Sequence, residues 1–464
     1  MEKNSWVAEE IKAVNLCDKR LKKRLGNVLE ALGDKPTTSI PLACRGWGEL
    51  KAAYRFFDNE KVNEKEILNS HRLTSIDRIK QEKVVLLLQD TTDLNYTGKN
   101  DIEGLGKIGN DYECYGIYLH AMLAVTPERI SLGCVNSKFW TRQEEGIRAQ
   151  RGKKKIEDKE SYRWIEGFKI AEEIAKEVPN TLIVNVADRE SDIYEFFLQT
   201  NGIREKQGAH WIVRSAHNRN VTGKGDKKIW EGVRESPVIG EIEFAMPQGR
   251  KRKARQVKQE VKLAKVKLNP FFNRGFKEKS NIEINAVLAE EINAPRGAVK
   301  AKWMLLTSLP ITSYEQAVEI IQWYLCRWQI EIFFKLLKSG CGVEELQLEK
   351  AERLRKCIAL YLIIAWRILF VTMQGRKCPD MPCDTLFEDD EWKSVYMVTY
   401  KRSPPKTPPR LQEMIIMIAK LGGFIGRKSD GEPGAKTIWQ GMQRMRDFAV
   451  AWDAFNVTTG KRCG

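Results

Sequence analysis

Hydrophobic residues near the start of the chain recur with the period of an amphipathic helix. Over residues 9–32 they stand three or four positions apart, and a second helical stretch covers about 49–57. We therefore expect residues 1–62 to form a helical domain. The polar face of the first helix is basic and includes Arg20 and Arg24.

The middle of the chain changes to the short apolar runs that are typical of buried strands. The expected elements follow in this order: strands at 84–88, 116–125 and 130–139, a helix around 164–174, a strand at 181–187, a further helix, and a strand at 211–214. Three strands, a helix, a strand, a helix and a strand is the order of the ribonuclease-H-like fold. The pattern thus predicts an α/β class.

Residues 218–300 interrupt this order, because they alternate apolar and polar positions and predict an inserted β subdomain. An apolar strand at 303–307 and one long helix over about 314–338 then complete a central domain at 63–375. A proline-rich break follows, and residues 376–464 are expected to form a helical C-terminal domain. Its helices are predicted at 411–420 and 438–455.

Composition narrows the class of protein. The 464 residues include 78 Lys and Arg against 62 Asp and Glu, a net charge of +16, and 42% are hydrophobic. Such a chain can build sizeable cores, and its excess of positive charge, with basic patches at 19–24 and 250–255, suggests a nucleic acid partner. The ten cysteines contain no C-x-x-C pair and there are four histidines, so a zinc module is not expected.

The sequence predicts no membrane segment. The first residues lack the apolar core of a secretory signal. The longest apolar run, Cys357–Trp366, has ten residues, which are too few to cross a bilayer, so it predicts a buried helix. We expect a cytoplasmic protein with free thiols.

Two aspartates follow predicted strands. Asp90 stands two residues after the apolar run at 84–88, and Asp188 directly follows the run at 181–187. Because the carboxyl ends of parallel strands form sites in α/β folds, the two carboxylates are expected to meet there. Oxygen ligands without His or Cys suit Mg²⁺, with Mn²⁺ as a substitute. The alternative is that each aspartate only caps the following turn.

The long helix carries one polar stripe. Tyr324, Arg327, Glu331, Lys335 and Lys338 are spaced by 3, 4, 4 and 3 residues. At the helical period they fall within an arc of about 80°. The simplest alternative is a solvated helix face with salt bridges between residues one turn apart.

One further motif is dismissed. Gly104–Gly109 satisfies G-x-G-x-x-G, but polar residues precede it and no helix is predicted after it. Because a dinucleotide site needs a strand before this motif and a helix after it, a loop is expected and no nucleotide cofactor.

Three motifs in register resemble the DDE transposases of the IS-four family. They are Leu88-Gln89-Asp90-Thr91-Thr92, Ala187-Asp188-Arg189-Glu190-Ser191-Asp192-Ile193, and the spacing Tyr324, Arg327, Glu331 and Lys338. Shorter likenesses lie at 53–56, 285–293 and 421–424, so the resemblance covers nearly the whole chain. It implies a ribonuclease-H-like core with a β insertion, between a helical N-terminal DNA-binding domain and a helical C-terminal dimerisation domain.

The resemblance also implies residue roles. Asp90, Asp188 and Glu331 would be the catalytic metal ligands and hold two Mg²⁺ ions. The remaining positions would contact DNA: Tyr324, Arg327, Lys335 and Lys338 at phosphates beside the scissile bond, Trp303 at a flipped base, Arg214 at the end DNA, and Arg20 and Arg24 in the end-recognition helix. Alternatively, Trp303 is an ordinary core residue. Arg20 and Arg24 could likewise belong to a solvated helix face that contacts no DNA. Ala216 stands where a close relative has lysine, which weakens the assignment of Arg214.

The expected activity is cut-and-paste transposition of an insertion sequence in a prokaryotic cell. The protein would bind inverted-repeat ends of double-stranded DNA as a homodimer, nick them, form and reopen hairpins, and join the ends to target DNA. The alternatives are a ribonuclease-H-like nuclease without strand transfer and a DNA-binding transposition inhibitor without catalysis. The complete set of three acidic residues argues against the inhibitor.

Overall fold

The computed structural model describes most of the chain. The described residues are 6–16, 18–99, 102–109, 113–142, 155–200, 208–222, 228–246, 253–269, 282–427 and 430–460, without the side chains of 457–460. Of the basic patch predicted at 250–255, residues 250–252 lie outside this set. The chain divides into two compact units, which are treated separately below. The first unit comprises residues 1–78, 91–145 and 330–464, and the second comprises 79–90 and 146–329.

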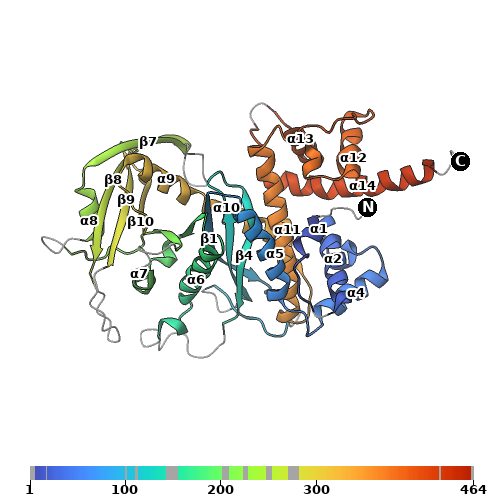
Figure 1. The fold of residues 1–464 in the computed structure, drawn as a ribbon, viewed down its shortest axis with the longest axis horizontal. Coiled ribbons are helices and arrows are strands. Elements are labelled where there is room, and N and C mark those ends of the chain that lie inside the picture. The colour runs from blue at the N-terminus through green and yellow to red at the C-terminus, as the bar shows by residue number, and fades with distance from the viewer. Residues whose placement is uncertain are drawn as a thin grey trace. The chain divides into compact units, whose positions relative to one another are not determined.

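The described strands form a large mixed sheet, and the two ends of the chain are helical (Figure 1). The predicted α/β class with helical ends is therefore confirmed. Strand β1 (Val84–Asn95) passes from the second unit into the first between Asp90 and Thr91.

The sheet of the second unit has parallel strands at its start and antiparallel strands after them. Its order is β1, β5 (Leu182–Ala187), β6 (His210–Arg214), β10 (Lys302–Thr307), β9 (Ile282–Ile292), β8 (Arg255–Leu268) and β7 (Val238–Met246). Strands β1, β5 and β6 are parallel to one another, and β10 joins β6 to β9 by antiparallel pairing. The inserted strands therefore continue the core sheet and do not form a sheet of their own, because β10 hydrogen-bonds on both edges.

Helices cover this sheet. Helix α6 buries the four residues expected on its apolar face, Trp164, Phe168, Ala171 and Ile174, and it contacts β5. Helix α9 packs against β7, β8 and β9. The helices and short turns of this unit are η1 (Ile156–Asp158), α6 (Tyr162–Glu177), η2 (Arg189–Ser191), α7 (Tyr194–Thr200), α8 (Ile229–Arg234) and α9 (Tyr314–Leu325).

The first unit contains the predicted meander. Strands β3 (Tyr115–Val125) and β4 (Ser131–Trp140) pair antiparallel, and β2 (Gly106–Lys107) pairs with the start of β3. The G-x-G-x-x-G run thus contributes a loop and a short strand. The helices of this unit are α1 (Trp6–Glu10), α2 (Lys19–Asp34), α3 (Ile40–Ala43), α4 (Trp47–Phe57), α5 (Glu64–Ile79), α11 (Ala351–Lys377), α12 (Asp389–Tyr400), α13 (Leu411–Leu421) and α14 (Ala435–Gly460), with short turns η5 (Val343–Glu345) and η6 (Cys383–Thr385).

The single helix predicted over 9–32 is wrong, since the structure has α1 and α2 with a connecting segment. The carboxylate of Asp18 accepts a hydrogen bond from the backbone N–H of Arg20 at 2.8 Å. An aspartate at this position satisfies a helix N–H that has no partner in the helix, so α2 begins here as a new helix.

Helix α11 is the central helix of the first unit. Within the described residues it is the one helix whose length and composition would allow it to cross a membrane, and 83% of its most apolar window is buried inside the protein. It contacts β4, α2, α13 and α14. Because Cys357–Trp366 is buried throughout, the prediction of a buried helix is confirmed.

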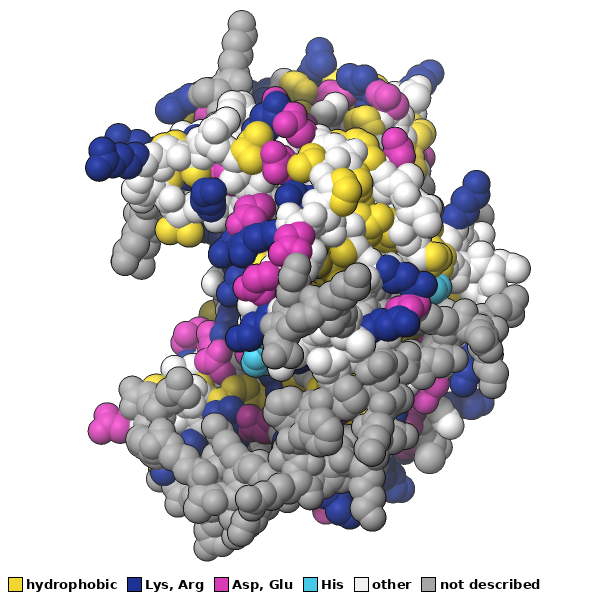
Figure 2. Space-filling view, turned by 90° about the vertical axis from the view of Figure 1, so that its left-hand side faces the viewer, with side chains coloured by type: hydrophobic (Ala, Val, Ile, Leu, Met, Phe, Trp, Pro, Cys, Tyr) yellow, Lys and Arg dark blue, Asp and Glu magenta, His cyan; other side chains and the backbone are white. Residues whose placement is uncertain are grey.

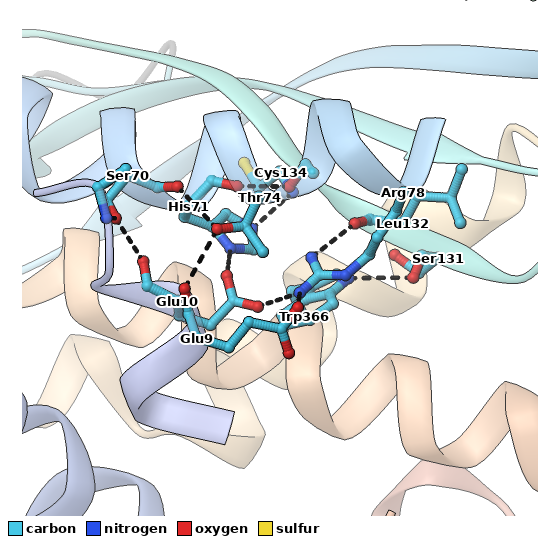
Figure 3. Close-up of polar contacts among 12 residues, drawn as sticks. Glu9, Glu10, Ser70, His71, Thr74, Arg78, Ser131, Leu132, Cys134 and Trp366 are labelled. Carbon is cyan, nitrogen blue, oxygen red and sulfur yellow. Dashed lines mark hydrogen bonds and ion pairs between the residues drawn. The ribbon is translucent and has the colours of Figure 1, made fainter. Parts of the chain in front are cut away.

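A buried charged cluster ties α1 and α5 to β4 and α11 (Figure 3). The Glu10 carboxylate contacts both the His71 ring and the Arg78 guanidinium. His71 Nε2 accepts a hydrogen bond from the Cys134 N–H at 3.0 Å, so its other nitrogen carries the proton that faces Glu10. Burial raises the pKa of Glu10, but His71 and Arg78 outweigh it and hold that pKa below its ordinary value. The Arg78 guanidinium lies 4.3 Å from the Trp366 ring.

Charges of both signs are mixed over the face that Figure 2 presents, where Lys and Arg side chains alternate with Asp and Glu. The described Lys and Arg side chains do not form one continuous patch on this face. Sites for a polyanion therefore have to be located from individual residues.

Candidate active site

Asp90 and Asp188 occupy corresponding positions on neighbouring parallel strands. The register pairs Leu88 of β1 with Val186 of β5, and each aspartate stands two residues beyond this pair. Because side chains alternate between the faces of a sheet, both carboxylates belong to the same face at the same level. The apolar residues before them are fully buried, which fixes the two strands.

A buried amide pair holds the two strands together just before this point. Gln89 donates a hydrogen bond from its side chain to the Asn185 side chain, and both residues are wholly buried. A Cβ at Gly167 of α6 would lie 2.1 Å from the Gln89 Oε1 atom, so only glycine leaves room for this pair. Sequence reasoning missed it, although a lone Gln and a lone Asn in apolar strands are a recognisable signal.

The two aspartates differ in local structure. Asp188 follows β5 directly and accepts a hydrogen bond from the Glu190 N–H at 2.8 Å, so it caps the turn η2. The alternative that this aspartate only caps the following turn therefore accounts for one of the two carboxylate oxygens of Asp188. Asp90 lies inside β1, which continues to Asn95 through two β-branched threonines. The expectation that Asp90 follows the end of this strand is therefore wrong.

Cations and a tyrosine gather around these carboxylates in the second unit. Arg327 Nη1 lies 3.0 Å from Asp90 Oδ2, and these side chains are 15% and 19% exposed. Tyr324 is hydrogen-bonded to the Arg214 side chain and interacts electrostatically with Arg327 and Asp188. Burial raises the pKa of the Tyr324 hydroxyl, which therefore remains a neutral hydrogen-bond donor.

The buried Asp192 orders the chain after Arg214. Sequence reasoning did not single it out as a functional residue. Asp192 accepts hydrogen bonds from the backbone N–H groups of Ala216 at 2.6 Å and His217 at 2.8 Å, and it pairs with Arg219. The DDE-like motif around Asp188 contains this residue, so its signal was present. It fixes the loop that follows Arg214.

The helix expected over 314–338 is interrupted. Helix α9 ends at Leu325, and α10 (Trp328–Lys335) is followed by a π-helical turn (Leu336–Gly340). At the interruption the Arg327 N–H bonds to the Tyr324 carbonyl at 3.0 Å, three residues back, so the backbone tightens there. The stripe of polar residues is therefore not the face of one regular helix.

The remaining stripe residues, Glu331, Lys335 and Lys338, belong to the first unit. Lys338 Nζ lies 3.5 Å from Glu344 Oε1 and 3.9 Å from Asp93 Oδ1. Lys335 is exposed and lines a pocket of about 480 Å³ with residues of α14. The structure thus places Lys335 beside α14 and Lys338 beside two carboxylates.

The donor set suits a hard cation. Asp90 and Asp188 offer carboxylate oxygens from adjacent strands, which is the ligand chemistry that Mg²⁺ and Mn²⁺ prefer. Among the residues that the structure describes, no three acidic, His or Cys side chains are arranged as a ready metal site. Arg327 supplies the positive charge beside Asp90 in this structure.

Trp303 lies on β10 and is half-buried. Its ring stacks on Phe244 of β7, with ring centroids 5.7 Å apart and planes inclined by 19°. One part of the ring is thus covered by Phe244 while another part reaches solvent. Phe244 was missed as a functional candidate, because its alternating strand pattern gives no sign of a stacked partner.

Arg20 and Arg24 lie on α2. Together with Lys23 they line a groove of about 360 Å³, whose other wall includes Glu49 and Ala52 of α4. Their cationic side chains therefore border a recess, and the opposite face of α2 is buried.

Comparison with known families agrees with this distribution of residues. Residues 3–62 match a transposase DNA-binding domain, 173–367 a transposase DDE domain, and 363–455 the dimerisation domain of the Tn5 transposase. The chain belongs to the Tn5-like DDE transposases. This transposase is therefore a DNA-cleaving and strand-transferring enzyme that depends on divalent metal, binds DNA and has a dimerisation domain.

The candidate residues of the transposase fall into different matched domains. Arg20 and Arg24 fall in the DNA-binding match, and Asp188, Glu331 and the other candidates of the core fall in the DDE match. Asp90 precedes the matched DDE range, so its assignment rests on its position beside Asp188.

One solved structure with a similar chain is a piggyBac transposase synaptic complex with hairpin DNA. Its chain is 10% identical, and the alignment covers 80% of this transposase and 72% of that chain with a TM-score of 0.35. A likeness at this TM-score is too weak to support a conclusion.

Proposed function

We propose that this transposase moves an insertion sequence by cut-and-paste transposition. The observation that carries the proposal is the cluster in which Asp90 and Asp188 stand at corresponding strand positions beside Arg327, Tyr324 and Arg214. Paired carboxylates with adjacent cations suit phosphodiester chemistry, in which a metal site and phosphate contacts act together.

Asp90, Asp188 and Glu331 would hold two Mg²⁺ ions. When bound, such ions activate the attacking oxygen and stabilise the leaving oxygen of an in-line displacement. Tyr324 and Arg327 would donate hydrogen bonds to the phosphate beside the scissile bond, and Lys335 and Lys338 would add phosphate contacts. Arg327 would exchange its contact with Asp90 for the DNA phosphate.

The reaction would begin with hydrolysis that frees a 3′-hydroxyl at the transposon end. That hydroxyl would attack the phosphodiester of the opposite strand, forming one P–O bond as another breaks, and so close a hairpin. Water would reopen the hairpin, and the 3′-end would then be joined to target DNA. Trp303 would stack on a base that leaves the duplex when the strand bends.

The three parts of the chain would divide this work. Residues 1–62 would recognise the inverted repeats through Arg20 and Arg24, 63–375 would carry the catalytic centre with Arg214 at the end DNA, and 376–464 would join two copies in the synaptic complex. No nucleotide cofactor is required. The substrate would be met at the nucleoid of a prokaryotic cell.

The test uses the full-length protein and a linear DNA fragment that carries the flanking inverted repeats. Incubation with Mg²⁺ is expected to release an excised, hairpin-ended fragment, and EDTA is expected to prevent its release. Products are separated on native and denaturing gels. Nicked DNA without hairpins or joined products would instead indicate a nuclease without strand transfer.

A further inference from the structure

The N-terminal helical region exposes a tryptophan that the proposed chemistry leaves unused. Trp47 is the first residue of α4, and 76% of it is exposed. Tryptophan is largely buried in most folded proteins. An exposed indole offers a large apolar area that a partner can cover.

The two residues that flank Trp47 are glycines without side-chain neighbours. Trp47 stands in the run Arg45-Gly46-Trp47-Gly48, and no atom lies within 4 Å of where a Cβ would stand at Gly46 or Gly48. Glycines in open space allow a ligand to approach the backbone closely. A large partner can therefore approach the backbone beside Trp47 as well as its exposed side chain.

The groove of α2 and α4 lies in the same helical region. Arg20, Lys23 and Arg24 line it, against the single carboxylate of Glu49. Arg45, two residues before Trp47, is a further exposed cation, and its guanidinium lies 3.7 Å from the Asp34 carboxylate. The charge balance of this surface suits a polyanion, whereas a protein partner would have to bring an acidic face to it.

We propose that Trp47 is an apolar DNA contact that acts beside these phosphate-binding cations. The Trp47 ring packs against deoxyribose and base edges of the transposon-end duplex, while Arg20, Lys23 and Arg24 bind its phosphates. The occupant is duplex DNA, and this rests on the proposed recognition of inverted repeats by residues 1–62.

The two kinds of contact have different salt dependence. Each phosphate that a cation neutralises adds about −0.9 to the slope of log K against log salt concentration. An apolar contact to a sugar or a thymine methyl group releases no counterion and leaves this slope unchanged. Trp47 and Arg24 can therefore be separated by titration at several salt concentrations.

The experiment measures binding of the full-length protein to a labelled inverted-repeat duplex and to a scrambled duplex by fluorescence anisotropy. Trp47→Ala is expected to weaken binding of the inverted repeat about tenfold with an unchanged salt slope. Trp47→Phe keeps an aromatic ring and is expected to stay within about threefold of the wild type. Arg24→Ala is expected to reduce the slope by about 0.9.

Val299→Ala is the matched control, because Val299 is 89% exposed and lies between β9 and β10, outside the regions proposed for end recognition and dimerisation. It is expected to bind like the wild type. If Trp47→Ala binds the inverted repeat within twofold of the wild type, Trp47 does not contact DNA. A change in oligomeric mass on Trp47→Ala, measured by light scattering, would show that a second copy covers this ring and would also overturn the proposal. If the wild type itself does not prefer the inverted repeat, the proposed end recognition fails instead.

Discussion

Two clusters pair carboxylates with arginine in this protein, and they differ in solvation. In the cluster around Glu10, the carboxylate is 1% exposed and the Arg78 side chain is 18% exposed, and a tryptophan ring lies against Arg78 (Figure 3). In the cluster around Asp90, the carboxylate is 19% exposed and Arg327 is 15% exposed. The two arginines are about equally exposed, so the difference lies in the carboxylates: solvent, a metal ion or DNA can reach that of Asp90 more easily than that of Glu10.

The surroundings explain the difference. The two Glu10 oxygens meet Arg78 and His71, and His71 is in turn bonded to the backbone of β4, so the charges are balanced within the fold. In the second cluster Arg327 contacts Asp90, and Tyr324 interacts with Asp188, Arg327 and Arg214. These arginines and the tyrosine are suited to phosphate as well as to carboxylate. The same residue types thus balance their charges within the fold in one unit and, in the function we propose, serve chemistry in the other.

The largest effect is expected for Asp90→Asn. Asparagine keeps the shape of the side chain but loses the charge that binds a cation, so cleavage is expected to fall at least about a thousandfold. End binding and the melting temperature are expected to change little. Strand cleavage on denaturing gels is the measurement, with Glu283→Gln on β9 as the control acid. Cleavage by Asp90→Asn at the control rate would remove Asp90 from the catalytic set.

A large loss of stability is expected for Glu10→Gln. The change leaves the Arg78 guanidinium without its counter-charge and His71 without its carboxylate acceptor, and the free energy of unfolding is expected to fall by about 3 kcal/mol at neutral pH. Urea denaturation measures it. Glu9→Gln is the matched control, because Glu9 is 57% exposed and lies 3.9 Å from the same arginine. Its loss is expected to stay below about 1 kcal/mol.

The loss of stability caused by Glu10→Gln is expected to depend on pH. The pKa of Glu10 is lowered in the folded protein, so its stabilisation is present above the ordinary value of 4.5 and is lost as the pH falls below it. The difference between the wild type and Glu10→Gln should therefore shrink in acid. A difference that stays constant down to pH 3 would mean that the Glu10 charge does not stabilise the fold.

A smaller effect is expected for Trp303→Ala. Stacking of a base on an indole contributes about 1–3 kcal/mol, so hairpin formation is expected to slow roughly tenfold while the first nick is spared. Time courses of nicked and hairpin products measure the rate of hairpin formation relative to that of the first nick. Trp230→Ala, which removes another half-buried indole in the same unit, is the control. Equal slowing of both steps together with a lower melting temperature would make Trp303 a structural residue.

The smallest effect is expected for Arg234→Ala. Arg234 forms two 3.0 Å hydrogen bonds to Glu290, but its side chain is 41% exposed. Exposed pairs contribute little because water competes with them, so the loss of stability is expected to be below about 1 kcal/mol. Urea denaturation checks this. A loss equal to that of Glu10→Gln would show that exposure does not distinguish the two kinds of pair.

Strands with continuous apolar runs were predictable from the sequence. The runs at 84–88 and 181–187 form β1 and β5, and the two aspartates were found because they follow these runs. A strand that is buried on both faces consists of a continuous run of apolar residues. Such a run can be recognised in the sequence without knowing which strands pair with it. The family resemblance, which the domain matches confirm, added the expected roles.

Features that depend on contacts between distant segments were not predictable. The interruption before α10 leaves the helical spacing of the polar stripe intact, so periodicity suggested one helix. The Gln89–Asn185 pair and the stacking of Trp303 on Phe244 join residues that are far apart in the chain. The pairing of Arg327 with Asp90 likewise depends on how β1 and the segment after α9 meet.

The central claim is that Asp90 and Asp188 bind the catalytic metal, and a change of metal preference tests it most directly. Each aspartate is replaced in turn by cysteine, whose thiolate is a poor ligand for Mg²⁺ and a better one for the softer Mn²⁺. Nicking of the inverted-repeat duplex is then measured with each ion. We expect Asp90→Cys and Asp188→Cys to lose nicking in Mg²⁺ and to regain it in Mn²⁺. Nicking at the wild-type rate in Mg²⁺ by either variant would contradict the claim.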